Sequence, residues 1–470
     1  DYNKLALAGS ADNQTISIKG TNGTTIALTD DDSLGLYSLE TVTVDSLSVA
    51  NTLADLQTTG VGATKLVVTG NKLLTITAAL DTEVATIDSS ASTGGLTLST
   101  APANTNATII GGDGVESGLA PVGMANISGG AGNDSFDFAA TYNALDVYDG
   151  GDGTDTVKMS TGFTDNSVVG GLSNVEIIQV STAETVTLET AIPGVTTFDF
   201  SDADDQVLNL LDGYVGDMTV NIKGDDTNAD SVVNTANISL NVTGNVEDFD
   251  GSGDTTLTGG LGSDTLTMSN TTDGATAVLA GNITGVDAIV LNDVTPGADA
   301  TITTGAYTLD ATFVKSMSVD ASSLDAGEDF TFGGSSSVTR MDITAGAGND
   351  SLTLGTIADT VDAGAGNDTV VGTSGGNNIS LGAGNDSLTA GTGNEVVDGG
   401  AGNDTFNLDG NLNSGDSIDG GAGTDTLIIS SGISTASVLG GSSNLEIITE
   451  TGANTITANA SLGGASVFNF

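Results

Sequence analysis

The chain has 470 residues and a formal net charge of −53, from 61 acidic and 8 basic side chains. So few basic residues cannot form the positive surface that nucleic-acid binding requires, nor a patch for anionic membranes. The chain has no His and no Cys, which excludes Ser-His-Asp and Cys-His nucleophiles, His-based zinc sites and disulfides, and no apolar run is long enough to cross a bilayer.

Such a charge is typical of disorder, but 38% of the residues are hydrophobic, which is enough for a long core. Of the acidic residues, 50 are Asp and only 11 are Glu. Asp favours turns and sites for hard cations, whereas a helical acidic protein would favour Glu. The composition therefore predicts a β-rich, turn-rich chain whose charge is balanced by bound cations.

The first region, residues 1–110, consists of short segments in which apolar or β-branched residues alternate with polar ones. Examples are Lys65–Gly70 and Leu73–Leu80, with turn residues between them. This alternation predicts strands, which we interpret as coils of a β-solenoid. One segment, Ser46–Gln57, has the spacing of a helix, and we expect a helix there.

The second region, residues 111–200, is one copy of a longer repeat. Residues 129–200 align without a gap onto 399–470, with 33 of 72 positions identical. Both copies start with GGAGND, continue through GTDT and end in a GGxSNxEII segment. The second copy stops at Phe470, where the first copy runs on, so we expect this sequence to be a fragment of a longer chain.

The remaining regions continue the same array. Residues 201–344 predict further solenoid coils, with a short Gly-Asp block near 250–267 that contains GGLGSDTLT. Residues 345–407 divide into seven consecutive nine-residue units, and residues 408–470 form one further turn and more coils. The eighth position of each nine-residue unit is apolar: Leu352, Val361, Val370, Ile379, Leu388, Val397 and Phe406.

These units resemble the GGxGxDxUx nonapeptides of RTX proteins, and the Ser/Thr/Val-rich coils between them resemble those of RTX-type bacterial S-layer proteins. The resemblance implies an all-β fold, a right-handed parallel β-helix or β-solenoid with calcium-binding RTX β-roll segments. In such a roll each unit forms a turn and then a short strand, and two units complete one coil, so every second turn lies on the same side. The sixth-position Asp and the glycine carbonyls supply oxygen ligands to calcium ions, and the eighth-position side chain points into the core.

This period of two units predicts a calcium ladder on one side of the roll only. Units that start at 345, 363, 381 and 399 all contain GAGND, whereas the interleaved units have lost glycines or the Asp. We therefore expect Asp359, Asn377 and Glu395 on the other side to bind weakly or not at all. The expected carboxylate ligands are Asp350, Asp368, Asp386 and Asp404, and the expected carbonyl ligands are Gly346, Gly348, Gly364, Gly366, Gly382, Gly384, Gly400 and Gly402.

The same reasoning predicts smaller calcium sites elsewhere. Glu116 and Asp134 are separated by exactly one coil of two units, and Asp155 and Asp425 extend their ladders after a coil that is slightly longer. Asp264 is the corresponding residue of the middle block. Since Gly-Asn-Asp runs also form turns without a metal, that alternative stays open for the isolated unit Gly259–Thr267.

Three functions remain for a chain of this kind: an S-layer subunit, the repeat region of a large secreted adhesin, or the calcium-binding tail of a secreted enzyme. We expect no enzyme, because no catalytic group of residues stands out. Short blocks distributed among Ser/Thr-rich coils favour a lattice subunit over an adhesin. The resemblance implies an extracellular position on a bacterial surface, secretion by a type I system, self-association in a two-dimensional lattice, and a surface polysaccharide as a further partner of a part outside this sequence. Nucleic acid and membrane insertion are excluded.

Overall fold

The strands of the chain pair in parallel with strands one coil away, so the fold is a parallel β-solenoid. The computed structural model is all-β apart from one 3-10 turn, η1 (Asn166–Val169), within the residues that it describes. Those residues are 13–20, 24–27, 40–57, 62–163, 166–182, 184–200, 206–211, 214–222, 230–234, 236, 238–245, 255–260, 262–270, 275–279, 283–293, 300–304, 317–334, 340–430, 441–451 and 467–469. They include no helix that is long and apolar enough to span a membrane.

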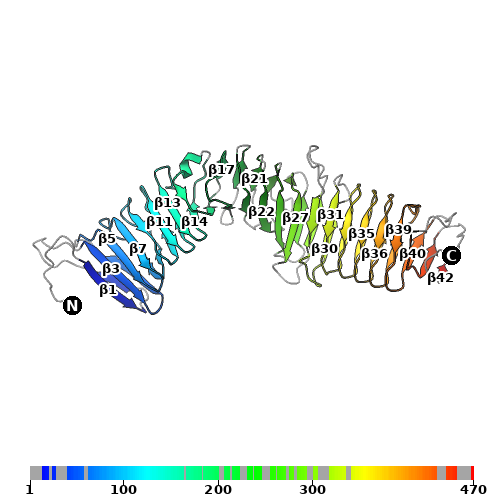
Figure 1. Cartoon of the computed structure of the whole chain (residues 1–470), viewed down its shortest axis with the longest axis horizontal. Helices are drawn as coiled ribbons and strands as arrows, with labels where there is room; N and C mark the ends of the chain where they lie inside the picture. The colour runs from blue at the N-terminus through cyan, green and yellow to red at the C-terminus, as the bar shows by residue number, and fades with distance from the viewer. Residues whose placement is uncertain are drawn as a thin grey trace, which may run out of the picture. The chain divides into compact units, whose positions relative to one another are not determined.

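The chain divides into two units, Asp1–Met218 and Thr219–Phe470 (Figure 1). In the first unit, successive strands of the chain enter two parallel stacks alternately, so each coil contributes one strand to each stack. One stack is β1 (Asn13–Lys19), β3 (Thr41–Leu47), β5 (Lys65–Gly70), β7 (Thr86–Ser92), β9 (Thr108–Ile110), β11 (Asn126–Ala131), β13 (Val147–Asp152) and β15 (Leu172–Ser173). The other is β2 (Thr24–Ala27), β4 (Asn51–Gln57), β6 (Leu74–Ile76), β8 (Leu96–Leu98), β10 (Glu116–Leu119), β12 (Ser135–Asp137), β14 (Thr156–Met159), β16 (Ile177–Val180) and β18 (Thr197–Asp199), while β17 (Thr185–Leu188) pairs with β19 (Val207–Leu210).

The second unit repeats this arrangement, and β20 (Met218–Asn221) lies at the division between the units. One stack is β22 (Leu240–Asn245), β24 (Thr265–Asn270), β27 (Ala288–Asp293), β29 (Met317–Asp320), β31 (Met341–Thr344), β33 (Thr360–Asp362), β35 (Asn378–Ser380), β37 (Val396–Asp398) and β39 (Ser417–Asp419). The other is β25 (Ala275–Leu279), β28 (Ala300–Thr304), β30 (Phe330–Gly333), β32 (Ser351–Thr353), β34 (Thr369–Val371), β36 (Ser387–Thr389), β38 (Thr405–Asn407), β40 (Thr426–Ile429), β41 (Ile447–Glu450) and β42 (Val467–Asn469). A third, shorter stack is β21 (Ser231–Asn234), β23 (Thr256–Thr258) and β26 (Ile283–Thr284).

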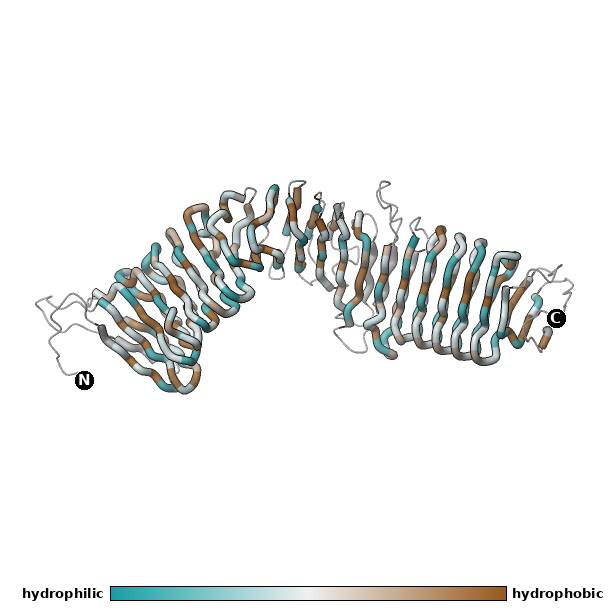
Figure 2. Tube along the Cα trace, viewed as in Figure 1, coloured by the Kyte–Doolittle hydropathy of each residue, from teal (hydrophilic) through white to brown (hydrophobic). Residues whose placement is uncertain are grey.

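The predicted period of two nine-residue units is confirmed in the roll. Thr360 of β33 pairs with Asn378 of β35, and Asn378 pairs with Val396 of β37, so each partner lies two units further along the chain. All seven eighth-position side chains are at most 3% exposed. Because successive residues of a strand point to opposite faces, the central residue of each three-residue strand enters the core and its neighbours face out. Apolar residues thus form continuous rows along each stack (Figure 2).

The helix expected at Ser46–Gln57 is wrong, because this segment contributes to two strands, β3 and β4. A turn between them contains Ser48, with a φ of 75°. The pairing of β4 with β2 shifts register within β4, between Leu53 and Asp55. Since this bulge interrupts the alternation, Leu53 and Leu56 both face the core at a spacing of three. That spacing is what imitates a helix in the sequence.

Candidate calcium sites

The Gly-Asp turns of the roll stack so closely that only glycine fits. Gly382 and Gly384 have φ values of 94° and 148°, in the left-handed region that residues with a side chain rarely adopt. A Cβ on Gly384 would overlap the carbonyl oxygen of Gly366 in the preceding coil, and a Cβ on Gly382 would overlap that of Gly364. The predicted carbonyl ligands therefore lie in two columns along the turns. The other members of these columns are Gly346, Gly348, Gly400 and Gly402.

The sixth-position carboxylates form a hydrogen-bonded ladder along the same turns. The amide of Asp368 donates to Oδ1 of Asp386 at 2.8 Å, and the amide of Asp386 donates to Oδ1 of Asp404 at 2.8 Å. The same bond occurs one coil earlier and one coil later in the chain. The amide of Asp350 donates to Oδ1 of Asp368 at 2.7 Å, and the amide of Asp404 donates to Oδ1 of Asp425 at 2.8 Å. One carboxylate oxygen of each of these residues thus accepts a hydrogen bond from the coil before it, and the other oxygen is left to bind a cation.

The second oxygen of most ladder residues is buried without a hydrogen-bond partner. This holds for Oδ2 of Asp368, Asp386, Asp404 and Asp425, whose side chains are at most 2% exposed. Asp350, at the start of the ladder, differs because its Oδ2 accepts a 3.2 Å bond from the amide of Gly346. A buried, unpartnered carboxylate oxygen is costly unless a cation or donor meets it.

Burial raises the pKa of every carboxyl group in this ladder. The pKa is about 7 for Asp368, where the charges of Asp350 and Asp386 add to the effect of burial. It is about 6 for Asp350 and for Asp404. The pKa values of Asp386 and Asp425 are also raised, first by burial. Without a bound cation, ionisation of these carboxyl groups therefore destabilises the folded roll.

The opposite side of the roll has the same ladder but few free oxygens. Both oxygens of Asp359 accept backbone bonds, from Met341 at 2.9 Å and Gly355 at 3.0 Å. Asn377 continues the ladder through Oδ1, and its unpartnered atom is the amide nitrogen, which cannot ligate a cation. In this row, Oε1 of Glu395 is the buried carboxylate oxygen without a partner. Fewer carboxylate oxygens are thus free on this side, and the weaker calcium binding expected of it stays a prediction.

The first unit contains a shorter ladder of the same design. The amide of Glu116 donates to Asp134 and that of Asp134 to Asp155, both at 2.7 Å. Each of these three residues has one buried oxygen without a partner. Burial raises the pKa of Glu116 to about 8 and that of Asp134 to about 6, and it also raises the pKa of Asp155.

The middle block is different, although burial again raises the pKa of Asp264. Oδ1 of Asp264 accepts bonds from Asn234 at 3.2 Å and Leu240 at 3.1 Å, and Oδ2 accepts one from Gly260 at 2.7 Å. Both oxygens are therefore occupied by donors of the protein. Residues 250–254 and 261 of this block lie outside the described residues.

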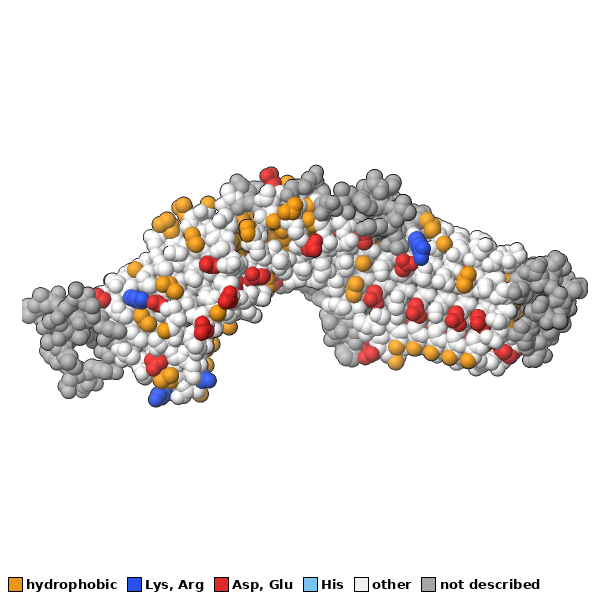
Figure 3. All heavy atoms as spheres, in the orientation of Figure 1, with side chains coloured by type: hydrophobic (Ala, Val, Ile, Leu, Met, Phe, Trp, Pro, Cys, Tyr) orange, Lys and Arg blue, Asp and Glu red, His pale blue; other side chains and the backbone are white. Residues whose placement is uncertain are grey.

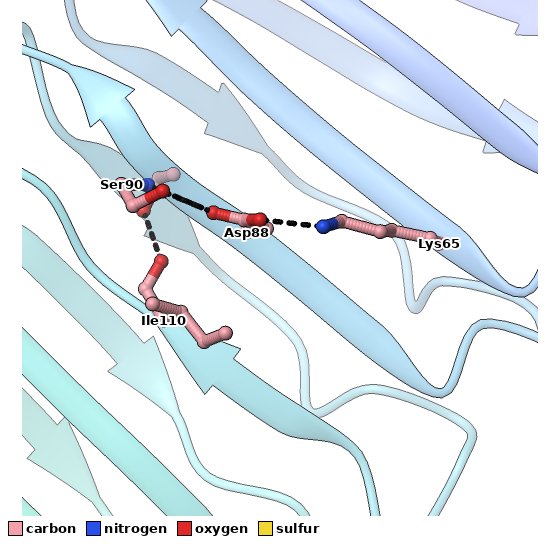
Figure 4. Close-up of polar contacts among 5 residues, drawn as sticks. Lys65, Asp88, Ser90 and Ile110 are labelled. Atoms are coloured by element: carbon pink, nitrogen blue, oxygen red, sulfur yellow. Dashed lines mark hydrogen bonds and ion pairs between the residues drawn. The ribbon is translucent and has the colours of Figure 1, made fainter. Parts of the chain in front are cut away.

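Carboxylates outside the ladders are stabilised in other ways. Asp88 on β7 accepts a 2.6 Å bond from Lys65 of β5 and another from Ser90 (Figure 4). Partial burial acts to raise the pKa of Asp88, but the bonds from Lys65 and Ser90 outweigh it, and the net direction is downward. Among the described residues, the ion pairs of Lys and Arg go to Asp88 and Asp342, not to the carboxylates of the GAGND turns.

The ladder residues fit calcium, which takes 6–8 oxygen ligands from carboxylates and carbonyls. No group of three or more His, Cys, Asp or Glu residues within the described ranges converges on one point. A site in the roll must therefore combine one or two carboxylates with the carbonyl columns. A Cβ on Gly129 would overlap both the unpartnered oxygen of Asp134 and the carbonyl oxygen of Gly150, so this carbonyl lies near the site as well.

A comparison with protein families identifies the repeats. The RTX calcium-binding nonapeptide repeat matches residues 249–267, 342–370, 371–406 and 413–435. The chain carries four RTX repeat segments. The matched repeats indicate that the protein binds several calcium ions, and RTX repeat proteins are typically secreted and extracellular. The smaller sites predicted at Glu116, Asp134 and Asp155 lie outside the matched residues. Comparisons with curated proteins and with solved structures found no match.

Sequence reasoning missed two features of the turns. The ladders continue beyond the nonapeptides, because Asp155 donates to Glu176 at 2.8 Å and Asp425 donates to Glu446 at 2.9 Å. The shared SNxEII segment was the available signal. The fifth-position asparagines form an exposed second ladder in the opposite direction, in which Asn385 donates to Oδ1 of Asn367 at 2.7 Å.

Proposed function

We propose that this chain is a structural cell-surface protein, a subunit of a bacterial S-layer lattice whose folding and self-assembly are triggered by calcium. The observation that carries the proposal is the distribution of the repeats. Matched calcium-binding segments lie at 249–267 and again from 342 to 435, with Ser/Thr-rich solenoid coils on either side. A chain of this kind is a long scaffold that calcium stabilises at intervals.

The trigger follows from the ladder chemistry. At low calcium, ionisation of Asp386 and its neighbours Asp368 and Asp404 leaves buried carboxylate oxygens without donors. Extracellular calcium modules typically have Kd values of about 10⁻⁴–10⁻³ M. Such sites are empty inside a cell and fill outside it, and the free energy of binding then contributes to folding.

Assembly has a related electrostatic requirement. Acidic side chains are spread over the visible face of the molecule and basic ones are few (Figure 3). A shallow groove on the outer face of the second unit is lined by four aspartates: Asp342, Asp362, Asp398 and Asp419. Two chains that each carry a charge of −53 repel one another unless cations neutralise their contact surfaces. Calcium at subunit boundaries would meet that requirement.

The alternative is the repeat region of a large secreted adhesin, which the matched repeats fit equally well. An enzymatic role is not part of the proposal, since the chain has no His and no Cys. The partner that we propose is a second copy of the chain in a two-dimensional lattice. Attachment of the lattice to a surface polysaccharide would use a part outside this sequence.

The deciding experiment is assembly of the full-length protein at 10 mM calcium, followed by negative-stain electron microscopy. We expect two-dimensional crystals that dissolve on chelation and return when calcium is restored. Magnesium at the same concentration controls for screening by a divalent cation. Persistent monomers in calcium would refute the lattice proposal and favour the adhesin.

A further inference from the structure

A short turn follows the last nonapeptide turn in both copies of the long repeat. In the first copy, Ser173 pairs with Asp149 and Ile177 pairs with Thr156. Three residues, Asn174–Glu176, therefore occupy the place of the six residues Gly150–Asp155 in the coil before. Asn444–Glu446 does the same in the second copy, between residues that pair with Asp419 and Thr426.

The residue types explain how three residues can replace six. Asn174 and Asn444 have φ values of 49° and 53°, in the left-handed region that Asn tolerates better than most residues. Each Asn side chain donates a 2.7 Å bond to an aspartate of the coil before, Asp149 or Asp419. The ladder position is taken by Glu. Its longer side chain accepts the hydrogen bond from the backbone amide of Asp155 or Asp425, a bond that an Asp side chain accepts where the next turn has six residues.

Oxygen atoms converge between the two kinds of turn. A Cβ on Gly150 would overlap the carbonyl oxygen of Asn174 and would lie 2.5 Å from Oδ2 of Asp155. That Oδ2 atom has no partner, and Asp155 is 0% exposed. In the second copy a Cβ on Gly420 would overlap the carbonyl oxygen of Asn444, and Oδ2 of the fully buried Asp425 is again unpartnered.

A third short turn provides an internal contrast. Gly285 has a φ of 73°, and Asp287 accepts a 3.1 Å bond from the amide of Asp264. The backbone design is the same, but both oxygens of Asp264 are already occupied by donors of the protein. This turn therefore offers no unpartnered carboxylate oxygen to a cation.

We propose that each Asn-x-Glu turn closes one additional calcium site at the end of its ladder. In the first unit the ligands are Oδ2 of Asp155, the carbonyl of Asn174 and the carboxylate of Glu176. In the second they are Oδ2 of Asp425, the carbonyl of Asn444 and the carboxylate of Glu446. Each of these sites lies between a six-residue nonapeptide turn and a three-residue Asn-x-Glu turn. The proposal does not depend on whether the chain forms a lattice.

The test counts calcium ions bound per chain by equilibrium dialysis at saturating calcium. Glu176→Gln and Glu446→Gln keep an oxygen for the ladder hydrogen bond but remove the charge. Each should lower the count by one, and the double variant by two, with an unchanged far-UV circular dichroism spectrum. The matched control Asp287→Asn should keep the full count. An unchanged count in either Gln variant overturns the assignment of that turn, and a lost ion in the control overturns the role of the unpartnered oxygen.

A second measurement covers variants that do not fold. Crystals of the unaltered chain grown in calcium should show anomalous density about 2.3–2.6 Å from Oδ2 of Asp425 and from the carbonyl oxygen of Asn444. Density at Asp404 but none at Asp425 would overturn the proposal while leaving calcium binding by the nonapeptides intact.

Discussion

Replacement of Asp386 by Asn separates a ligand role from a general effect of charge. Asn keeps an oxygen to accept the 2.8 Å bond from the amide of Asp368 and replaces the unpartnered Oδ2 by a nitrogen that cannot ligate calcium. One site with a Kd of about 10⁻⁴–10⁻³ M contributes about 1.4–2.7 kcal/mol of stability at 10 mM calcium. We expect Asp386→Asn to lose about this amount of calcium-dependent stability.

The assay compares protease resistance of residues 345–428 in a calcium titration. The matched control is Asp409→Asn, in the same roll, because Asp409 is exposed and its replacement removes the same charge. We expect the midpoint of the titration to move to higher calcium for Asp386→Asn and to stay in place for the control. Equal shifts for both variants would refute the ligand role and leave only long-range electrostatics. Without calcium, Asp386→Asn should be at least as stable as the unaltered chain, because burial raises the pKa of Asp386.

Three further predictions concern the same roll. Because folding raises the pKa of Asp368 to about 7, the stability of the calcium-free chain should fall as the pH rises from about 4 to 7. Unfolding followed by circular dichroism in calcium-free buffer checks this, and a stability that rises with pH over this range would contradict it. Gly384→Ala should abolish calcium-dependent ordering of the roll, since its Cβ overlaps a carbonyl oxygen, while Gly327→Ala, with open space around it, should not. Leu388→Ala should cost about 2–5 kcal/mol in chemical denaturation, and the exposed Thr389→Ala under about 0.5 kcal/mol.

The parts of the fold that depend on repetition could be predicted from the sequence. The eighth-position apolar residue is the centre of each three-residue strand and enters the core because its two neighbours face out, so the period of nine predicts both the coil and the pairing of Thr360 with Asn378. A difference in calcium binding between the two sides is also predicted, because the loss of glycine and Asp at Asn377 and Glu395 is visible in the sequence; it stays a prediction. The structure adds a reason for keeping these residues, since both still carry a rung of the ladder.

The parts that depend on an interruption of the repeat could not be predicted. The bulge at Leu53–Asp55 shifts which side chains face the core, and only the paired strand reveals it. Glu176 and Glu446 lie outside the nonapeptide pattern because each belongs to a turn of three residues instead of six, and each is a Glu at the ladder position instead of an Asp. Asp264 matches the pattern as well as Asp134 does, yet Asn234 and Leu240 of a neighbouring coil donate to its Oδ1, and Gly260 of its own turn donates to its Oδ2.

The two opposed ladders have a consequence for how such a chain changes length during evolution. In each GAGND coil the Asp amide bonds to the coil after it and the Asn amide bonds to the coil before it. Removal of residues 363–380 would bring Asp350 beside Asp386 and Asn385 beside Asn349, with the same atoms facing one another as now. Duplications and deletions of a whole coil therefore preserve both ladders, whereas a change of a single nine-residue unit would place a GAGND turn against the depleted side. Selection would then tolerate variation in whole coils, and relatives of this chain should differ in the length of this block by even numbers of nonapeptides.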